Sequence, residues 1–287
     1  MLAYYPEEVR PQLARFLGAY ESLALHARLP EVLQHCHCAV LQRDAGDRTL
    51  FDVLHDDREE GIRLYHSAID LLAGFQKASD RGLNAPFTAE FFFGELEMAR
   101  DFYVQRLMQF DGAPLVPFLK TIAENVAKHP YVLCHRDFHG QNLHVSSDTL
   151  YLIDYQDLRM GPDMYDLASL LRDRGVARII GDHAELELLE HYVRVTGAAG
   201  DVRRRYFETL LQRSIKILGT FSKQPITRGR FHYIDFIPAT LESVRRCLDE
   251  LPGYAALRDI FPLAYDGPAV ENRARELNRE YTRNGET

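Results

Sequence analysis

Two short stretches carry most of the information in this sequence of 287 residues: CHRDFHGQNL at residues 134–143 and YLIDYQD at residues 151–157. Each adjoins a run of apolar residues, which predicts a short strand beside a polar turn. Asp137 stands in the first stretch, Asn142 follows it five positions later, and Asp154 ends the second apolar run, 17 positions after Asp137. We therefore expect a pair of short strands to carry these polar side chains at their ends.

The spacing of these residues resembles the catalytic loop and metal-binding aspartate of protein-kinase-like phosphotransferases. Further residues restrict the resemblance to one superfamily. They are His139, the sequence Ile-Asp-Tyr-Gln-Asp in place of Asp-Phe-Gly, and the motifs Gly-Pro at 161–162 and Tyr-Asp-Leu-Ala at 165–168. They are similar to the aminoglycoside phosphotransferase and choline kinase-like superfamily. Within it, the sequence most resembles bacterial kinases that phosphorylate the anomeric hydroxyl of N-acetylmuramate and N-acetylglucosamine. The resemblance covers about residues 1–262 and implies an α+β, protein-kinase-like bilobal fold.

The resemblance implies a role for each residue of the motif. Asp137 would accept or orient the proton of the substrate hydroxyl, while His135 and Arg136 would brace the loop. Asn142 and Asp154 would hold Mg²⁺ against the phosphates of ATP. Two protein oxygen ligands suit Mg²⁺, because this ion keeps octahedral geometry and gives up its waters reluctantly. Phosphoryl transfer depends mainly on positioning and charge neutralisation, so this small set is sufficient in principle.

The resemblance also implies which residues contact the adenine of ATP. Gln42, with its neighbours Leu41 and Arg43, falls where the family's interlobe hinge meets adenine through backbone groups. The family's small lobe begins with a strand, a nucleotide-covering loop and a second strand, and this sequence starts where the third strand is expected. No lysine precedes Lys77, so the usual phosphate-binding lysine is absent as well. We expect a small lobe without its first strands and with an exposed sheet edge.

Three further side chains are candidates for substrate contact. Asp157 follows the metal aspartate, and Gln212 and Lys216 lie four apart on one face of a predicted helix, where they would border a sugar pocket. Surface pairing explains the helical pair equally well. Asp166, at the head of an apolar helical stretch, is expected to cap that helix or to brace the catalytic loop.

The predicted organisation has two parts. Residues 1–46 form a reduced N-terminal lobe, with a strand stub, a helix that begins near Pro11 and a strand pair made of EVLQHCHC and AVLQRD. Residues 47–287 form a mainly helical C-terminal lobe that contains the catalytic loop and the metal-binding hairpin. The apolar spacing of three and four that runs through most of this second part predicts amphipathic helices.

Composition and charge exclude several classes. With 46% hydrophobic and 26% charged residues, the chain is globular and neither disordered nor collagen-like. No stretch approaches a membrane span and the N-terminus lacks a signal-peptide pattern, so we expect a cytoplasmic protein. The net charge of −8, without a long basic block, argues against nucleic acid as the main partner. It does not argue against a phosphate ligand whose charge a metal ion neutralises.

Four cysteines are too few for a disulfide framework in a chain of this size, so we expect reduced thiols. The run His35-Cys36-His37-Cys38 suggests zinc. A strand would direct the histidines to one face and the cysteines to the other, and structural zinc sites usually draw on two separated ligand pairs. We therefore disfavour zinc here. Cys134 lies in an apolar strand and is expected to be a buried core thiol.

The preferred function is ATP- and Mg²⁺-dependent phosphorylation of a small-molecule hydroxyl, on an amino sugar. Two alternatives stay open. The absent covering loop and lysine are typical of a pseudokinase that binds nucleotide or acts as a scaffold. The superfamily also contains aminoglycoside and choline kinases, and the sequence does not distinguish their substrates from an amino sugar.

Overall fold

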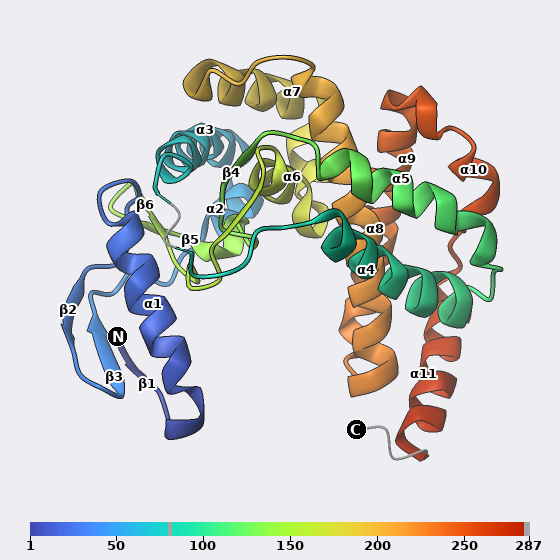
Figure 1. Ribbon diagram of the computed structural model, residues 1–287, viewed down its shortest axis with the longest axis horizontal. Coiled ribbons are helices and arrows are strands. Elements are labelled where there is room, and N and C mark those ends of the chain that lie inside the picture. Colours follow the sequence, from blue (N-terminus) through green and yellow to red (C-terminus); the bar gives the residue numbers. More distant parts are fainter. Residues whose placement is uncertain (80–81, 284–287) are drawn as a thin grey trace. The chain divides into compact units, whose positions relative to one another are not determined.

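The computed structural model describes residues 1–79 and 82–283 (Figure 1). Contacts between residues divide the chain into two compact units. The catalytic motif belongs to the first unit. This division does not follow the lobes predicted on either side of residue 46, and those lobes remain a prediction. The first unit comprises Met1–Pro86 and Pro130–Val202, and the second comprises Phe87–His129 and Arg203–Thr287.

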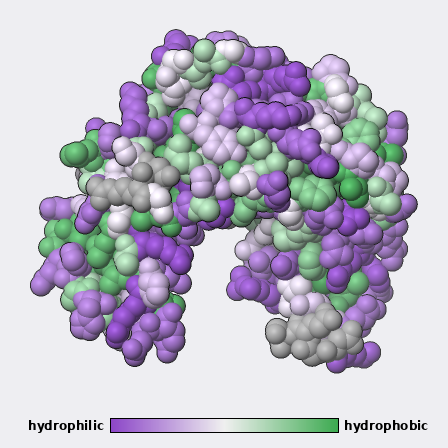
Figure 2. Space-filling view, in the orientation of Figure 1, coloured by the Kyte–Doolittle hydropathy of each residue, from purple (hydrophilic) through white to green (hydrophobic). Residues whose placement is uncertain are grey.

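An antiparallel sheet of three strands begins the first unit. The predicted hairpin is observed as β2 (Val32–His35) paired with β3 (Ala39–Gln42), and β1 (Leu2–Tyr4) pairs with the other edge of β3. Strand alternation buries Val40 and exposes Leu41. Figure 2 shows hydrophobic residues over this sheet, at the left of the view. The large exposed apolar side chains there are Met1, Leu2, Tyr4, Leu33 and Leu41.

Helix α1 (Arg10–Leu23) has a proline, Pro11, in its first turn, where the missing N–H costs no hydrogen bond. Leu13, Phe16 and Leu23 belong to the buried face of this helix. The hydroxyl of Tyr20 accepts a hydrogen bond from the backbone N–H of Val32 at 3.3 Å. The helix is therefore tied to the first residue of β2.

Two strongly capped helices follow, the first of 7 residues and the second of 18. At the start of the first, Thr49 and Asp52 form a reciprocal capping box, and at the start of the second the Asp57 carboxylate accepts hydrogen bonds from two backbone N–H groups. Such caps satisfy the donors that every helix N-terminus leaves unpaired. The helices of the first unit after α1 are α2 (Leu50–Asp56), α3 (Arg58–Phe75), α6 (Tyr165–Arg172) and α7 (Val176–Thr196).

Helix α7 is kinked at Gly181, whose backbone has a φ of 80° and a ψ of 160°. A side chain is strained in this conformation, which glycine adopts freely. The Arg58 guanidinium donates to the carbonyl oxygens of Ile179 and Ile180 at 2.8 and 2.7 Å. The first residue of α3 therefore binds carbonyl groups immediately before the kink.

Two strand pairs frame the catalytic motif. The β5 (Leu143–Ser146) and β6 (Thr149–Leu152) strands form the predicted hairpin, closed by Ser147 and Asp148 in the left-handed region. The two apolar runs that end in Cys134 and Asp154 were expected to form one pair of short strands, and they do not pair with each other. Strand β4 (Tyr131–Cys134) pairs instead with β7 (Arg159–Pro162), a strand that the sequence did not reveal.

The second unit is helical in the part that the structure describes. Its helices pack closely where Gly219 meets Ala99, since a Cβ on the glycine would lie 2.7 Å from the alanine Cα. No helix among the described residues combines the length and the apolar character that a membrane crossing requires. The main helices here are α4 (Ala89–Ala99), which continues as π-helical turns (Arg100–Leu107), α5 (Val116–Val126), α8 (Val202–Arg228), α9 (Ile237–Glu250), α10 (Leu257–Ile260) and α11 (Gly267–Arg283).

Candidate active site

The catalytic loop is held by a buried carboxylate. Asp166, in the first turn of α6, is fully buried. Its two oxygens accept hydrogen bonds from the backbone N–H groups of His135 at 2.6 Å and Arg136 at 2.9 Å. Charge-assisted hydrogen bonds of this kind are among the strongest in proteins. Of the two structural roles considered for Asp166, the structure shows the brace, since the residue before the helix is Met164 and no side chain caps it.

Two residues of the motif adopt strained backbone conformations. Arg136 has a φ of 81° and Asp154 a φ of 62°. Non-glycine residues in this region cost about 1–3 kcal/mol each and persist only where the surroundings enforce them. Such strain is concentrated at functional sites, and here it occurs beside the candidate catalytic aspartate and at the candidate metal ligand. The Asp166 brace is one constraint that holds Arg136 in place.

His135 connects the candidate catalytic loop with the segment that carries Asp154, the candidate metal ligand. Its side chain is buried, and Nε2 lies 2.9 Å from the carbonyl oxygen of Ile153, the residue before Asp154. A carbonyl oxygen only accepts, so Nε2 carries the proton. Burial lowers the pKa of His135 below its ordinary value, although the Asp166 carboxylate acts in the opposite direction. His135 is therefore a neutral side chain that links the two candidate segments through this hydrogen bond, and its bracing role in catalysis remains a prediction.

Asn142 and Asp154 are brought to the same end of the β5–β6 hairpin. The backbone N–H of Ile153 donates to the Asn142 carbonyl at 3.1 Å, and the Asn142 amide nitrogen donates to the Asp137 carbonyl at 2.9 Å. This bond directs the amide so that its oxygen remains for a cation. One Asp154 oxygen accepts from Gln156 at 2.7 Å. The donor set consists of hard oxygens and fits Mg²⁺.

Asp137 differs from Phe138, its buried neighbour in the loop. Asp137 is exposed, as a residue that meets an incoming hydroxyl must be. Arg136 lies 3.9 Å from the Asp157 carboxylate, so the structure places Asp157 against the catalytic loop. A substrate contact by Asp157 remains a prediction. Gln156 donates a hydrogen bond to Asp154. The sequence analysis gave Gln156 no role, although its position two residues after this candidate metal ligand was the available signal.

The backbone groups of Gln42 that were predicted to contact adenine already form hydrogen bonds within the protein. Its backbone N–H donates to the Met1 carbonyl at 2.9 Å, and its carbonyl accepts from the Met1 amino group at 2.8 Å. The N–H of Arg43 is bonded to the Glu31 carbonyl at 2.8 Å. A hydrogen bond from the Gln42 N–H to adenine would therefore require its bond to Met1 to break, whereas the Gln42 carbonyl oxygen has a second lone pair for another donor. The roles of Gln42, Leu41 and Arg43 in nucleotide binding remain predictions.

The side chain of Gln42 has a structural role. It is buried, and its amide donates to the hydroxyl of Tyr155 at 3.4 Å. Tyr155 follows Asp154, the candidate metal ligand, and stacks on Phe16 of α1 with ring centroids 5.1 Å apart. Burial raises the pKa of the Tyr155 hydroxyl, so this group stays protonated. The N-terminal sheet and α1 therefore both contact the residue next to Asp154.

Gln212 and Lys216 lie on α8 in the second unit. Both face Glu95 of α4: the Gln212 amide donates to its carboxylate at 3.0 Å, and the Lys216 ammonium lies 3.9 Å from it. Gln212 is buried, so these contacts join α8 to α4 and differ from the surface pairing that the sequence offered as an alternative. A role in a sugar pocket remains a prediction for both residues.

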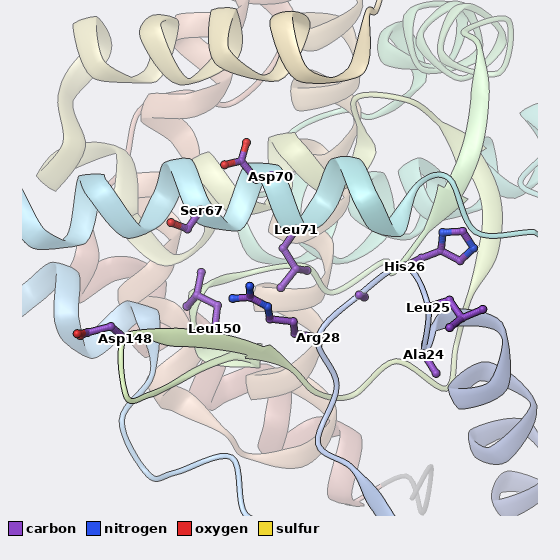
Figure 3. Close-up of a pocket in the computed structure, with 10 residues that line it drawn as sticks. Ala24, Leu25, His26, Arg28, Ser67, Asp70, Leu71, Asp148 and Leu150 are labelled. Carbon is purple, nitrogen blue, oxygen red and sulfur yellow. The ribbon is translucent and has the colours of Figure 1, made fainter.

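A cavity of about 540 Å³ lies elsewhere in the first unit. Figure 3 shows it between the segment that follows α1 and the face of α3 that carries Ser67 and Asp70, with Arg28 projecting into it. Its lining does not include Asp137, Asn142 or Asp154. We therefore assign it no part in phosphoryl transfer.

The sequence model of the phosphotransferase enzyme family (APH) matches residues 2–207, well over half of the chain. The chain belongs to this family. This phosphotransferase is 26% identical over 238 residues to the N-acetylmuramate/N-acetylglucosamine kinase of Pseudomonas aeruginosa, an alignment that covers 77% of this chain and 68% of the relative.

Solved structures confirm the fold of this phosphotransferase as α+β and protein-kinase-like. Choline kinase LicA from Streptococcus pneumoniae superposes with a TM-score of 0.58 at 16% identity, covering 88% of this chain and 85% of that chain. ADP-bound aminoglycoside phosphotransferase APH(2'')-Ib superposes with a TM-score of 0.55 at 16% identity, covering 84% and 85%. The family model that matches residues 2–207 confirms the predicted phosphotransferase family.

Proposed function

We propose that this phosphotransferase transfers the γ-phosphoryl group of ATP to the anomeric hydroxyl of an amino sugar of the N-acetylmuramate or N-acetylglucosamine type. The observation that carries the proposal is the placement of three residues. The Asn142 side chain donates to the backbone carbonyl of Asp137, and the Asn142 carbonyl accepts from the N–H of Ile153, the residue before Asp154. The Asp166 carboxylate bonds the backbone of the residues before Asp137, and the His135 side chain bonds the residue before Asp154. The match to a curated sugar kinase over 77% of the chain supports the choice of substrate.

The proposed step uses the exposed carboxylate of Asp137. Asp137 accepts the proton of the sugar hydroxyl while the hydroxyl oxygen forms a bond to the γ-phosphorus. The bond between that phosphorus and the bridging oxygen of ADP breaks, and ADP leaves with the electron pair. Mg²⁺, when bound by Asn142 and Asp154, neutralises negative charge on the phosphates.

The test measures ATP-dependent phosphate transfer with Mg²⁺ to N-acetylmuramate, N-acetylglucosamine, choline and an aminoglycoside. We expect transfer to the two sugars and a sugar 1-phosphate in the phosphorus NMR spectrum. The methyl glycoside of N-acetylglucosamine, whose anomeric oxygen is blocked, is the matched control and is expected to remain unmodified. Phosphorylation of this glycoside would contradict the anomeric position, and transfer to choline or the aminoglycoside alone would contradict the sugar.

A second candidate is a nucleotide-binding protein without transfer activity. The specific observation in its favour is the absence of lysine from residues 1–76, where a phosphate-binding lysine is expected. Binding of ATP with Mg²⁺, measured by calorimetry, together with no transfer to any of the four acceptors would favour this candidate. Transfer to any acceptor would exclude it.

A further inference from the structure

The turn between β2 and β3 places three potential metal ligands together. Strand β2 ends at His35, and the backbone N–H of Cys36 donates to the Ala39 carbonyl at 2.9 Å, which closes a tight turn. The sequence argument against zinc assumed that the strand continues and separates histidine from cysteine. The turn removes that separation. Ligand atoms of Cys36, His37 and Cys38 all lie within 4.8 Å of one another.

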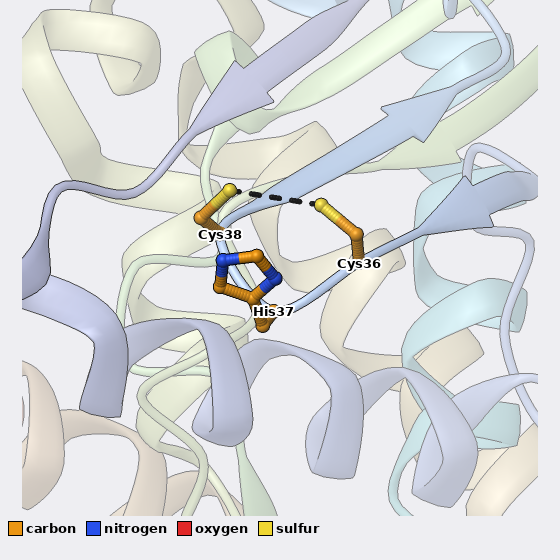
Figure 4. Close-up of side chains that lie close together, drawn as sticks. All are labelled: Cys36, His37 and Cys38. Carbon is orange, nitrogen blue, oxygen red and sulfur yellow. Dashed lines mark hydrogen bonds between the residues drawn. The ribbon is translucent and has the colours of Figure 1, made fainter.

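Figure 4 shows the arrangement: the two sulfurs face each other across the turn and the His37 ring lies beside them. Both cysteines are free thiols, and Cys36 is exposed. Their sulfur atoms are 3.7 Å apart. Two sulfurs bound to one tetrahedral zinc ion at about 2.3 Å would lie about 3.8 Å apart. The turn therefore already holds the cysteine pair at the spacing that zinc requires.

The chemistry of the turn also suits a thiophilic ion. Thiolate, and not thiol, is the metal ligand, and metal binding displaces the thiol protons. Two thiolates and one imidazole form a ligand set that selects zinc over Mg²⁺ or Ca²⁺. The set is unrelated to the oxygen ligands of the candidate active site.

We propose that the Sγ atoms of Cys36 and Cys38 and a ring nitrogen of His37 bind one zinc ion, with water at the fourth position. Binding exchanges the two thiol protons for Zn²⁺ and leaves both sulfurs as thiolates. The ion stabilises the turn at the end of the β2–β3 hairpin. Gln42 is the last residue of β3. The site stands independently of the proposed kinase activity.

The experiment uses the full chain, reduced and stripped with a chelator, and titrates it with Co²⁺ as a spectroscopic substitute for zinc. We expect one Co²⁺ per chain, with a sulfur-to-cobalt charge-transfer band and the visible bands of tetrahedral cobalt, all removed by stoichiometric Zn²⁺. Cobalt at the oxygen ligands of the candidate active site gives no sulfur band, so the two sites are distinguished.

Variants identify the ligands. Cys36→Ser and Cys38→Ser are expected to lose the charge-transfer band. His37→Ala is expected to weaken binding at least about tenfold, the loss that even an outer-shell partner produces. His35→Ala, an exposed neighbour outside the cluster, is the matched control and keeps the full band. Circular dichroism confirms that each variant is folded, as expected for changes in a surface turn.

Three results would overturn the site. One is a charge-transfer band that persists in a Cys36→Ser/Cys38→Ser variant. Another is half an ion per chain, which indicates a bridge between two copies. The third is a reduced protein that takes up no cobalt and forms a Cys36–Cys38 disulfide in air, which makes the turn a redox pair.

Discussion

The Asp166 carboxylate accepts hydrogen bonds from the backbone N–H groups of His135 and Arg136, at 2.6 and 2.9 Å. These are the two residues directly before Asp137. A buried carboxylate on the rigid first turn of α6 thus determines where the candidate catalytic loop begins. Arg136, at a φ of 81°, is held by this contact in a conformation that it would otherwise leave.

Removing this brace is expected to destabilise the first unit. Asp166→Ala leaves two backbone donors without their charged acceptor, and a hydrogen bond to a charged group contributes about 1.5–3 kcal/mol. We expect the free energy of unfolding to fall by about 3–5 kcal/mol in urea. Glu187→Gln, which breaks a surface pair with His183, is the control and should change stability by less than about 1 kcal/mol. Equal effects of the two substitutions would contradict the brace.

Tyr155 is expected to contribute through its ring more than through its hydroxyl. Tyr155→Phe removes a 3.4 Å hydrogen bond from Gln42 and should cost at most about 1 kcal/mol. Tyr155→Ala also removes the ring that stacks on Phe16 and should cost about 3–5 kcal/mol, as buried aromatic deletions do. Urea unfolding measures both values. A Tyr155→Phe variant as unstable as Tyr155→Ala would show that the hydroxyl dominates.

The pH dependence of stability is expected to reveal the buried His135. Burial lowers its pKa, so the folded protein keeps it neutral while the unfolded chain takes up a proton below about pH 6.5. Acidification through that value therefore favours the unfolded state, by at most about 1.4 kcal/mol per pH unit for one proton. Above it, His135 adds no pH dependence.

The measurement compares the free energy of unfolding at a series of pH values from neutral to mildly acidic. His135→Gln should show a shallower decline than the wild type. His183→Gln, in which the replaced side chain is 90% exposed, serves as the control and should retain the wild-type slope. An unchanged slope in His135→Gln would contradict the assignment.

Magnesium dependence is expected to follow Asn142 and Asp154. Asp154→Asn and Asn142→Ala each remove one proposed oxygen ligand, so the Mg²⁺ concentration for half-maximal activity should rise at least about tenfold. Asp148→Asn is the matched control, because it lies at the other end of the same hairpin at a φ of 57°, which asparagine tolerates. A rise of the same size in Asp148→Asn would indicate a general effect on the hairpin.

The features predicted from the sequence are those that residues close together in the chain determine. Pro11 indicated the start of α1, the apolar runs indicated the β5–β6 hairpin, and the motif spacing identified Asp137, Asn142 and Asp154 as one set. The hairpin and the loop bring these residues together through hydrogen bonds between near neighbours in the chain. Their roles in catalysis are proposals that the variants above examine.

Pairing between strands far apart in the chain could not be predicted from the sequence. The pairing of β4 with β7 joins residues such as Tyr131 and Pro162, and the strand Arg-Met-Gly-Pro has no alternation to reveal it. Likewise, the bonds between Met1 and Gln42 connect residues 41 positions apart. The turn at Cys36 was misjudged because one hydrogen bond, from its N–H to Ala39, ends the strand alternation that the argument assumed.

The most direct test of the central claim compares wild type with Asp137→Asn in ATP-dependent phosphorylation of N-acetylmuramate and N-acetylglucosamine. The substitution keeps the shape of the side chain and removes its capacity to accept the substrate proton. Since such acid–base groups contribute about 10²–10⁴-fold to rate, kcat/KM should fall by that factor while ATP binding is retained. Equal rates for the two proteins would contradict the role of Asp137 and with it the proposed mechanism.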